Sequence, residues 1–375
     1  MSQQAIFYLD LQNTTLTVEA VLPAGQKTLE LPQNAVPEEA DDDFQTAPAP
    51  DGPFTVYTFA ADRPHRFRYR CVLATGDLFG VSDHKILLNG YAGCFPRRLS
   101  ACVGETHCVL RQGFDGFDLI DGHHDADGRR YKCQLWTPDA PECANLICLR
   151  RGCYHSVSAG GFTAYCTRSA SIPCITDMIS YAAGCLDYDT RLFGARPAPH
   201  VSLLLLDEGE WDGSYARPGL IVLCGDGSEE SYCSALGHEL GRRWACGAAT
   251  DSFEDWLNET GARWLSNLML LHAGKGELLE QEKARLFAAY QQQPGPIRTP
   301  DGSRPANVPL AGTVLLWQVY QRYGMKTVIA LLRKFFDLKE KTTENWLAAV
   351  RQDKACAFVA DLLENALVKP DLLAL

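Results

Sequence analysis

Short apolar runs separated by polar and turn-forming residues dominate the first part of the chain. Ile6–Leu11 and Thr55–Phe59 are rich in β-branched and aromatic residues, which favour strands. Basic and aromatic residues alternate over Arg66–Arg70, which is typical of a strand with one buried and one exposed face. A nucleic-acid-binding stripe is the alternative interpretation of this alternation. The pattern predicts a β-rich domain.

A different pattern begins near residue 165. Apolar residues at helical spacing over Asp177–Phe193 predict a helix that ends at Gly194. The continuous apolar runs Val201–Leu206 and Leu220–Cys224 have the length of buried strands. A long loop is predicted over Gln293–Pro309, and further helices over Glu230–Cys246, Phe253–Ala273, Glu277–Gln292, Val314–Tyr323, Lys326–Phe336, Thr343–Arg351 and Cys356–Val368. A mostly helical domain therefore follows the β-rich one.

The composition is that of a globular protein with a sizeable core, since 46% of the 375 residues are apolar and 22% are charged. The formal net charge of −11 disfavours a nucleic-acid partner, because an acidic surface repels phosphate backbones. The apolar runs are far shorter than the roughly 18 residues of a membrane span, so no membrane partner is expected. The first residues show no basic segment followed by an apolar one, and we expect a cytoplasmic protein.

Fifteen cysteines are many for a cytoplasmic protein, and none of them forms a C-x-x-C pair. The densest set, Cys143, Cys148 and Cys153, is spaced by five residues, which on a strand puts successive members on opposite faces. Such a set does not suit one tetrahedral metal site. We interpret the cysteines as small buried hydrophobes kept reduced, with a disulfide framework or a structural zinc as the alternatives.

The most informative segment for chemistry is Gly237–Trp244, which contains His238, Glu239 and Arg242. In the zinc-peptidase helix H-E-x-x-H, two histidines one turn apart reach one metal, and the glutamate is the base for the metal-bound water. Here Arg242 takes the place of the second histidine, and a guanidinium cannot bind zinc. By itself, His238 is more typical of a hydrogen-bonded core histidine, and Glu239 of a buried ion-pair partner.

A second motif strengthens the first. Glu259 follows Arg242 by 17 residues and ends the tetrapeptide Trp256-Leu257-Asn258-Glu259. Together with His238-Glu239 and Trp244, this tetrapeptide resembles the aminopeptidase N and leukotriene hydrolase family of gluzincin metallopeptidases. The resemblance implies that His238 is the first zinc ligand, Glu259 the third, and Glu239 the general base.

The resemblance extends over most of the chain and implies a fold. Gly213–Ile221 resembles the family's G-x-M-E-N-x-G-L-I segment, and Gly312–Tyr323 resembles a helix that follows the active site. In the family, a saddle-like antiparallel β-domain precedes a thermolysin-like, mostly helical domain of the catalytic type. We therefore expect an α+β fold with domains over residues 1–162 and 163–375.

Three positions of the cleft depart from the family. Ala216 stands where the family has the glutamate that binds the substrate's α-amine, and Arg217 adds a charge that repels this amine. Pro309, with Val308 as the nearest alternative, stands where the family has its transition-state tyrosine, and neither side chain can donate a hydrogen bond. The spacing from Arg242 to the third ligand is also two residues shorter than the family's usual one.

Two hypotheses follow. The first is a pseudopeptidase with no cofactor, which binds a peptide or protein in the cleft between its domains, with Arg242 as the counter-charge to Glu239 and Glu259. The second is a residual zinc-dependent hydrolase, with Glu239 as the base and zinc held by His238, Glu259 and a third group such as a cysteine or another histidine. The sequence also predicts that Arg242→His rebuilds the ligand set and restores zinc binding.

Overall fold

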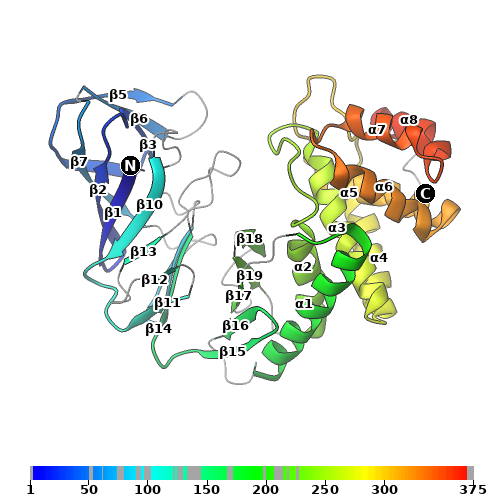
Figure 1. The fold of residues 1–375 in the computed structure, drawn as a ribbon, viewed down its shortest axis with the longest axis horizontal. Coiled ribbons are helices and arrows are strands. Elements are labelled where there is room, and N and C mark those ends of the chain that lie inside the picture. Colours follow the sequence, from blue (N-terminus) through cyan, green and yellow to red (C-terminus); the bar gives the residue numbers. More distant parts are fainter. Residues whose placement is uncertain are drawn as a thin grey trace.

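The chain folds into a β-rich half and a helical half, and the predicted α+β class is confirmed (Figure 1). The computed structural model describes residues 3–49, 54–60, 62–73, 80–89, 94–96, 103–120, 123–124, 130–132, 145–166, 172–196, 200–206, 214–217, 219–224 and 228–369. Blue and cyan strands form the first half, and the helices of the second half run from green to red. Within the described residues, no helix has both the length and the apolar character needed to cross a membrane.

The largest sheet of the first half has the strand order β12-β13-β10-β1-β2-β7-β4. Its neighbouring strands are antiparallel, except that β1 and β10 are parallel. The strands are β1 (Gln3–Gln12), β2 (Thr15–Leu22), β4 (Ala35–Ala40), β7 (His65–Val72), β10 (Val103–Leu110), β12 (His123–His124) and β13 (Arg130–Lys132).

Strand β7 confirms the interpretation of the alternating basic and aromatic residues. Phe67 and Tyr69 are buried, while the arginines between and beside them are exposed. Arg68 and Arg70 lie 3.1 and 3.8 Å from the carboxylate of Glu38. The basic face of the strand is therefore occupied by ion pairs within its own domain.

Two smaller antiparallel sheets complete the first half, with the orders β3-β6-β5 and β11-β14-β9-β8. Their strands are β3 (Thr28–Pro32), β5 (Phe44–Pro48), β6 (Phe54–Phe59), β8 (Gly80–Val81), β9 (Lys85–Asn89), β11 (Phe117–Leu119) and β14 (Asn145–Arg150).

A five-stranded sheet with the order β15-β16-β17-β19-β18 joins the two halves. Strands β16, β17 and β19 are parallel, whereas β15 and the edge strand β18 are antiparallel to their neighbours. Residue 162, where we expected the first domain to end, is the first residue of β16. The strands are β15 (His155–Ala159), β16 (Phe162–Cys166), β17 (Val201–Leu206), β18 (Tyr215–Arg217) and β19 (Leu220–Cys224).

Both faces of β17 and β19 are covered, which explains why their sequences are continuously apolar. Leu204 and Val222 lie in a cluster with Ile147 of β14, on the side of the first half. Leu203 and Leu223 belong to the helical core on the other side. The two strands predicted from these apolar runs are confirmed with the same bounds.

The helices are α1 (Ile172–Phe193), α2 (Glu229–Gly241), α3 (Asp255–His272), α4 (Gly276–Gln292), α5 (Val308–Tyr323), α6 (Met325–Asp337), α7 (Thr343–Gln352), the 3₁₀ helix η3 (Ala357–Val359) and α8 (Ala360–Val368). Three predicted bounds are wrong by five or more residues. Helix α1 begins at Ile172 and not at Asp177. Helix α2 ends before Cys246, because the chain turns to bury Trp244, whose Nε1 donates to the carbonyl of Gly194 at 3.0 Å. Helix α5 begins inside the predicted loop, since Pro309 is tolerated in a first turn.

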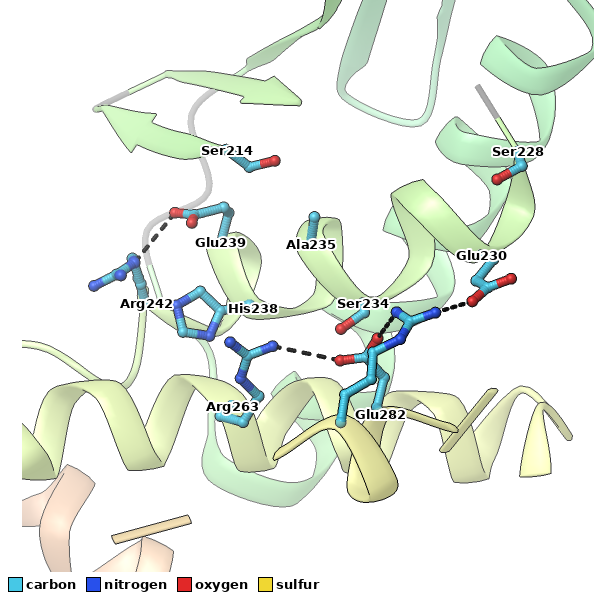
Figure 2. A pocket seen from close by; sticks show the side chains of 11 residues that line it. Ser214, Ser228, Glu230, Ser234, Ala235, His238, Glu239, Arg242, Arg263 and Glu282 are labelled. Atoms are coloured by element: carbon cyan, nitrogen blue, oxygen red, sulfur yellow. Dashed lines mark hydrogen bonds and ion pairs between the residues drawn. The ribbon is translucent and has the colours of Figure 1, made fainter. Parts of the chain in front are cut away.

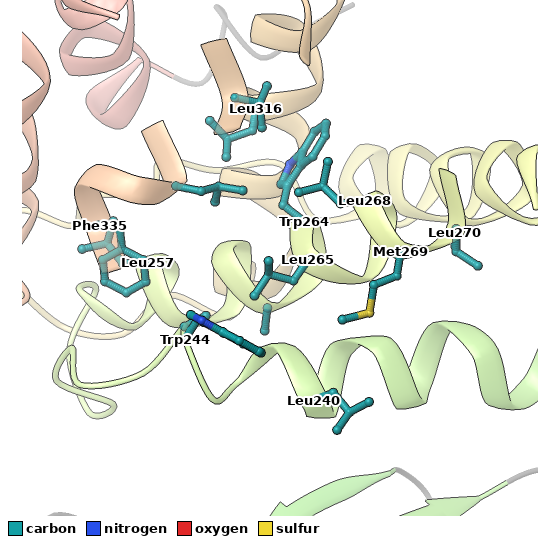
Figure 3. Close-up of a cluster of buried hydrophobic side chains, with 14 of the residues drawn as sticks. Leu240, Trp244, Leu257, Trp264, Leu265, Leu268, Met269, Leu270, Leu316 and Phe335 are labelled. Carbon is teal, nitrogen blue, oxygen red and sulfur yellow. The ribbon is translucent and has the colours of Figure 1, made fainter. Parts of the chain in front are cut away.

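The main core fixes α2 and α3 against each other and against α5 and α6 (Figure 3). Leu240 and Trp244 come from α2 and the turn after it, Leu257 and Trp264 from α3, and Phe335 from α6. These side chains are all buried. The crossing of α2 and α3, which carries the candidate site, is thus held by apolar packing on its far side.

Two glycines allow α2 and α3 to approach closely. A Cβ on Gly241 would lie 3.0 Å from the carbonyl oxygen of Ala262, and one on Gly237 would lie 2.8 Å from Oγ and 3.1 Å from Cα of Ser266. Ser266 cannot easily move away, because it is buried and its hydroxyl donates to the carbonyl of Ser234 at 2.9 Å.

Gly237→Ala is therefore expected to lower the free energy of unfolding by about 1–2 kcal/mol, although alanine favours a helix by about 1 kcal/mol over glycine. Gly184→Ala is the matched control, since Gly184 lies inside α1 and a Cβ there meets nothing within 4 Å. Chemical denaturation should show opposite signs for the two variants. Stabilisation by Gly237→Ala would mean that the helices are not closely packed.

Candidate functional site

The residues that the sequence assigns to the two ligand helices converge where α2 and α3 cross. His238 and Glu239 lie in the last turn of α2, and Glu259 lies in the second turn of α3. Arg242 is the first residue after α2, and its backbone N–H still donates to the carbonyl of His238 at 3.2 Å. The side chains of His238 and Arg242 therefore lie one helical turn apart.

Arg242 bridges the two carboxylates. Its Nε lies 3.1 Å from Oε2 of Glu239, and its Nη2 lies 3.0 Å from Oε1 of Glu259. The guanidinium side chain is 37% exposed, whereas those of Glu239 and Glu259 are 5% and 13% exposed. Burial acts to lower the pKa of Arg242, but the charges of the two carboxylates outweigh it and raise the pKa above its usual value. The arginine is therefore a fixed positive charge at this crossing.

His238 is a neutral ring between charged groups. Its pKa lies well below the usual value, first because of burial and then because the guanidinium groups of Arg242 and Arg263 repel a proton. Its Nε2 is 3.6 Å from Oε2 of Glu259, which is a contact of a neutral ring with a carboxylate and not an ion pair. Its Nδ1 is buried and has no hydrogen-bond partner within the described part of the chain.

His238, Glu239 and Arg242 lie at one end of a cavity of about 560 Å³ (Figure 2). The described residues that line it are mostly polar or charged: Ser214, Ser228, Glu230, Ser234, Ala235, His238, Glu239, Arg242, Arg263, Glu282 and Arg285. They come from α2, α3 and α4, from the segments before α2 and β18, and from the residue after α2. The cavity can therefore hold a polar ligand of the size of a short peptide.

Arg263, Glu282 and Arg285 form a second charged group that sequence reasoning missed. Nη1 of Arg263 lies 3.7 Å from Glu282, which Arg285 holds more closely at 2.9 Å. Arg285 also forms an ion pair with Glu230 on α2. The spacing from Glu259 to Arg263 is four residues, so a search along the same face of α3 would have found this arginine.

Two other positions expected in the cleft, Ala216 and Pro309, are not among the described residues that line the cavity. Ala216 is in the edge strand β18 and packs partly against the helical core. Pro309 is in the first turn of α5. The side chain of Arg217 lies outside the described part of the structure. Ser214, just before β18, lines the cavity instead.

Comparison with solved structures shows which known proteins share this fold. No protein-family model and no curated sequence matches the chain. Native yeast leukotriene A4 hydrolase matches with a TM-score of 0.67 and 11% identity, over 97% of this chain and 67% of that protein. A mutant of the M1 zinc metallopeptidase from Deinococcus radiodurans, bound to the substrate Tyr-Ser-Ala, matches with a TM-score of 0.65 and 14% identity, over 98% and 94% of the two chains. The chain has the fold of these enzymes.

This fold implies a zinc ion, but the residues at the crossing do not fit one. A zinc site needs three or four converging nitrogen, oxygen or sulfur ligands. Here His238 and Glu259 converge, and the guanidinium of Arg242 holds the carboxylate that would bind the metal. Among the described residues, no group of three His, Cys, Asp or Glu side chains is placed to hold a metal. The described cysteines are free thiols, and most are buried.

Proposed function

We propose that this protein is a pseudopeptidase, which binds a peptide or protein segment in the cavity at the α2–α3 crossing without cutting it. The observation that carries the proposal is the position of Arg242 between Glu239 and Glu259. Glu239 would be the general base of a peptidase, but its Oε2 accepts a hydrogen bond from Arg242. Arg242 thus forms ion pairs both with the residue that would be the base of a peptidase and with one that would bind its zinc.

The lining supports a peptide as the ligand class. The lining residues include guanidinium, carboxylate and hydroxyl groups, which match the backbone, termini and polar side chains of a peptide. The net charge of −11 argues against nucleic acid. We also propose a cytoplasmic location, which the free thiols of the described cysteines support.

The first test is metal content together with hydrolysis. Protein purified without added metal should carry far less than one zinc per chain by mass spectrometry, because two ligands and a cation cannot replace the usual set. Incubation with Tyr-Ser-Ala should leave the tripeptide intact. One chelator-sensitive zinc per chain, with cleavage of Tyr-Ser-Ala, would establish the residual hydrolase instead.

The second test is peptide retention. Immobilised protein should retain members of a random library of short peptides, and these should be recovered uncut. Ala235→Trp fills the cavity and should abolish retention, whereas Ala288→Trp, on the exposed face of α4, should retain the library as the native protein does. A native protein that retains no peptide, or equal retention by both variants, would contradict binding in this cavity.

A further inference from the structure

We infer that Arg263 is a second determinant that keeps metal ions out of this site, so that replacing Arg242 alone restores only weak metal binding. The inference rests on the proposed function, since it takes the native site to be metal-free. It departs from the expectation drawn from sequence, in which Arg242 is the only cation at the ligand position.

The two helices contribute matching pairs of groups to the crossing. Helix α2 and its following residue supply His238 and, one turn later, Arg242. Helix α3 supplies Glu259 and, one turn later, Arg263. Figure 2 shows the guanidinium of Arg263 beside the ring of His238, away from Arg242, and its charge acts on that ring. A metal held by His238 and Glu259 would lie near both guanidinium groups.

The charge of Arg263 is only partly compensated. Its nearest described carboxylate, that of Glu282, is 3.7 Å away and is shared with Arg285. Its Nε is buried without a hydrogen-bond partner in the described part of the structure. By contrast, two carboxylates contact Arg242 at 3.0 and 3.1 Å. Arg263 therefore presents the less neutralised charge of the two to a cation.

Substituting Arg242 by histidine removes one cation and adds a ligand, but it leaves Arg263 in place. A like charge a few ångströms from a partly buried site weakens ion binding by about 10²- to 10³-fold. Removing that charge with Arg263→Gln should strengthen metal binding by the same factor in a protein that already has histidine at position 242 as the third ligand.

The experiment measures Co²⁺ binding, because tetrahedral Co²⁺ has visible absorption bands that report ligation without any assay of activity. Four proteins are titrated: native, Arg242→His, Arg263→Gln and the double variant. We expect no bands for the native protein or Arg263→Gln, and a Kd for the double variant about 10²- to 10³-fold lower than that for Arg242→His. Arg322→Gln combined with Arg242→His is the control, since it removes the same net charge at an exposed position of α5.

The outcomes separate the inference from the function on which it rests. Equal Kd values for Arg242→His and the double variant would overturn the role of Arg263 and leave the pseudopeptidase standing. Stoichiometric Co²⁺ in the native protein would overturn the proposed function itself. A folded double variant that binds no Co²⁺ would also overturn the inference, because geometry and not charge would then exclude the metal. Arg263→Met, which keeps the aliphatic packing, replaces Arg263→Gln if circular dichroism shows that the latter unfolds.

Discussion

Arg242→Ala is expected to lower the free energy of unfolding by about 2–4 kcal/mol at neutral pH. The substitution leaves the carboxylates of Glu239 and Glu259 close together and largely buried, without the guanidinium that each of them contacts. Breaking a buried ion pair by removing one partner costs more than the pair contributes, because the remaining charge is not solvated. The lower end of the range allows for solvent screening, since the arginine side chain is 37% exposed.

Two controls make the result specific. Arg242→Lys keeps the charge, but an ammonium group cannot bridge two carboxylates with a planar fork, so it should give a loss between native and alanine. Arg322→Ala removes an exposed arginine at the end of α5 and should change the stability by less than about 0.5 kcal/mol. If the melting temperature of Arg242→Ala equalled that of the native protein, the bridge between α2 and α3 would contribute nothing.

Local sequence determined much of the fold and part of the site. The continuous apolar runs of β17 and β19 could be assigned because both faces of these strands are covered. The alternation in β7 could be assigned because one of its faces is exposed. The four-residue spacing from His238 to Arg242 placed the arginine beside the carboxylates. Each of these predictions depends on the order of residue types along a single stretch of the sequence.

What the sequence did not predict comes from pairing between elements. The parallel pairing of β1 with β10 joins strands that are distant in the sequence. Glu282 and Arg285 reach the cavity only because α4 packs beside α3. The end of α2 depends on the site where Trp244 is buried. Asp189 is a further example. A charged residue in a helix such as α1 usually indicates an exposed face, but the side chain of Asp189 is completely buried.

Asp189→Asn is expected to raise the free energy of unfolding by about 4 kcal/mol at pH 7. Asp189 has no solvent exposure, and neither carboxylate oxygen has a hydrogen-bond partner among the described residues. Burial raises its pKa from 3.8 to about 8. The charge of Asp189 acts on Tyr181, Cys185 and Tyr188 of the same helix, and burial is also the main cause of their raised pKa values.

The sign follows from proton linkage. The folded state binds the proton of Asp189 more tightly than the unfolded state does, so unfolding releases a proton between pH 3.8 and about 8. Over this window the native protein loses about 1.4 kcal/mol of stability for each pH unit of increase, relative to a variant that cannot ionise there. Asparagine has nearly the same shape and no charge, so the advantage of the variant should vanish near pH 4 and level off above pH 8.

The measurement is a series of chemical denaturations of both proteins from pH 4 to 9. Asp187→Asn is the matched control, because Asp187 lies on the same helix with a side chain that is 68% exposed and pairs with Arg191 at 3.0 Å. It should shift the stability by less than about 0.5 kcal/mol at any pH in the series. Parallel stability curves for the native protein and Asp189→Asn would show that the carboxyl of Asp189 titrates alike in the folded and unfolded states. It would then have to be hydrated in solution, because a carboxyl sealed in the helical core cannot ionise at its ordinary pKa.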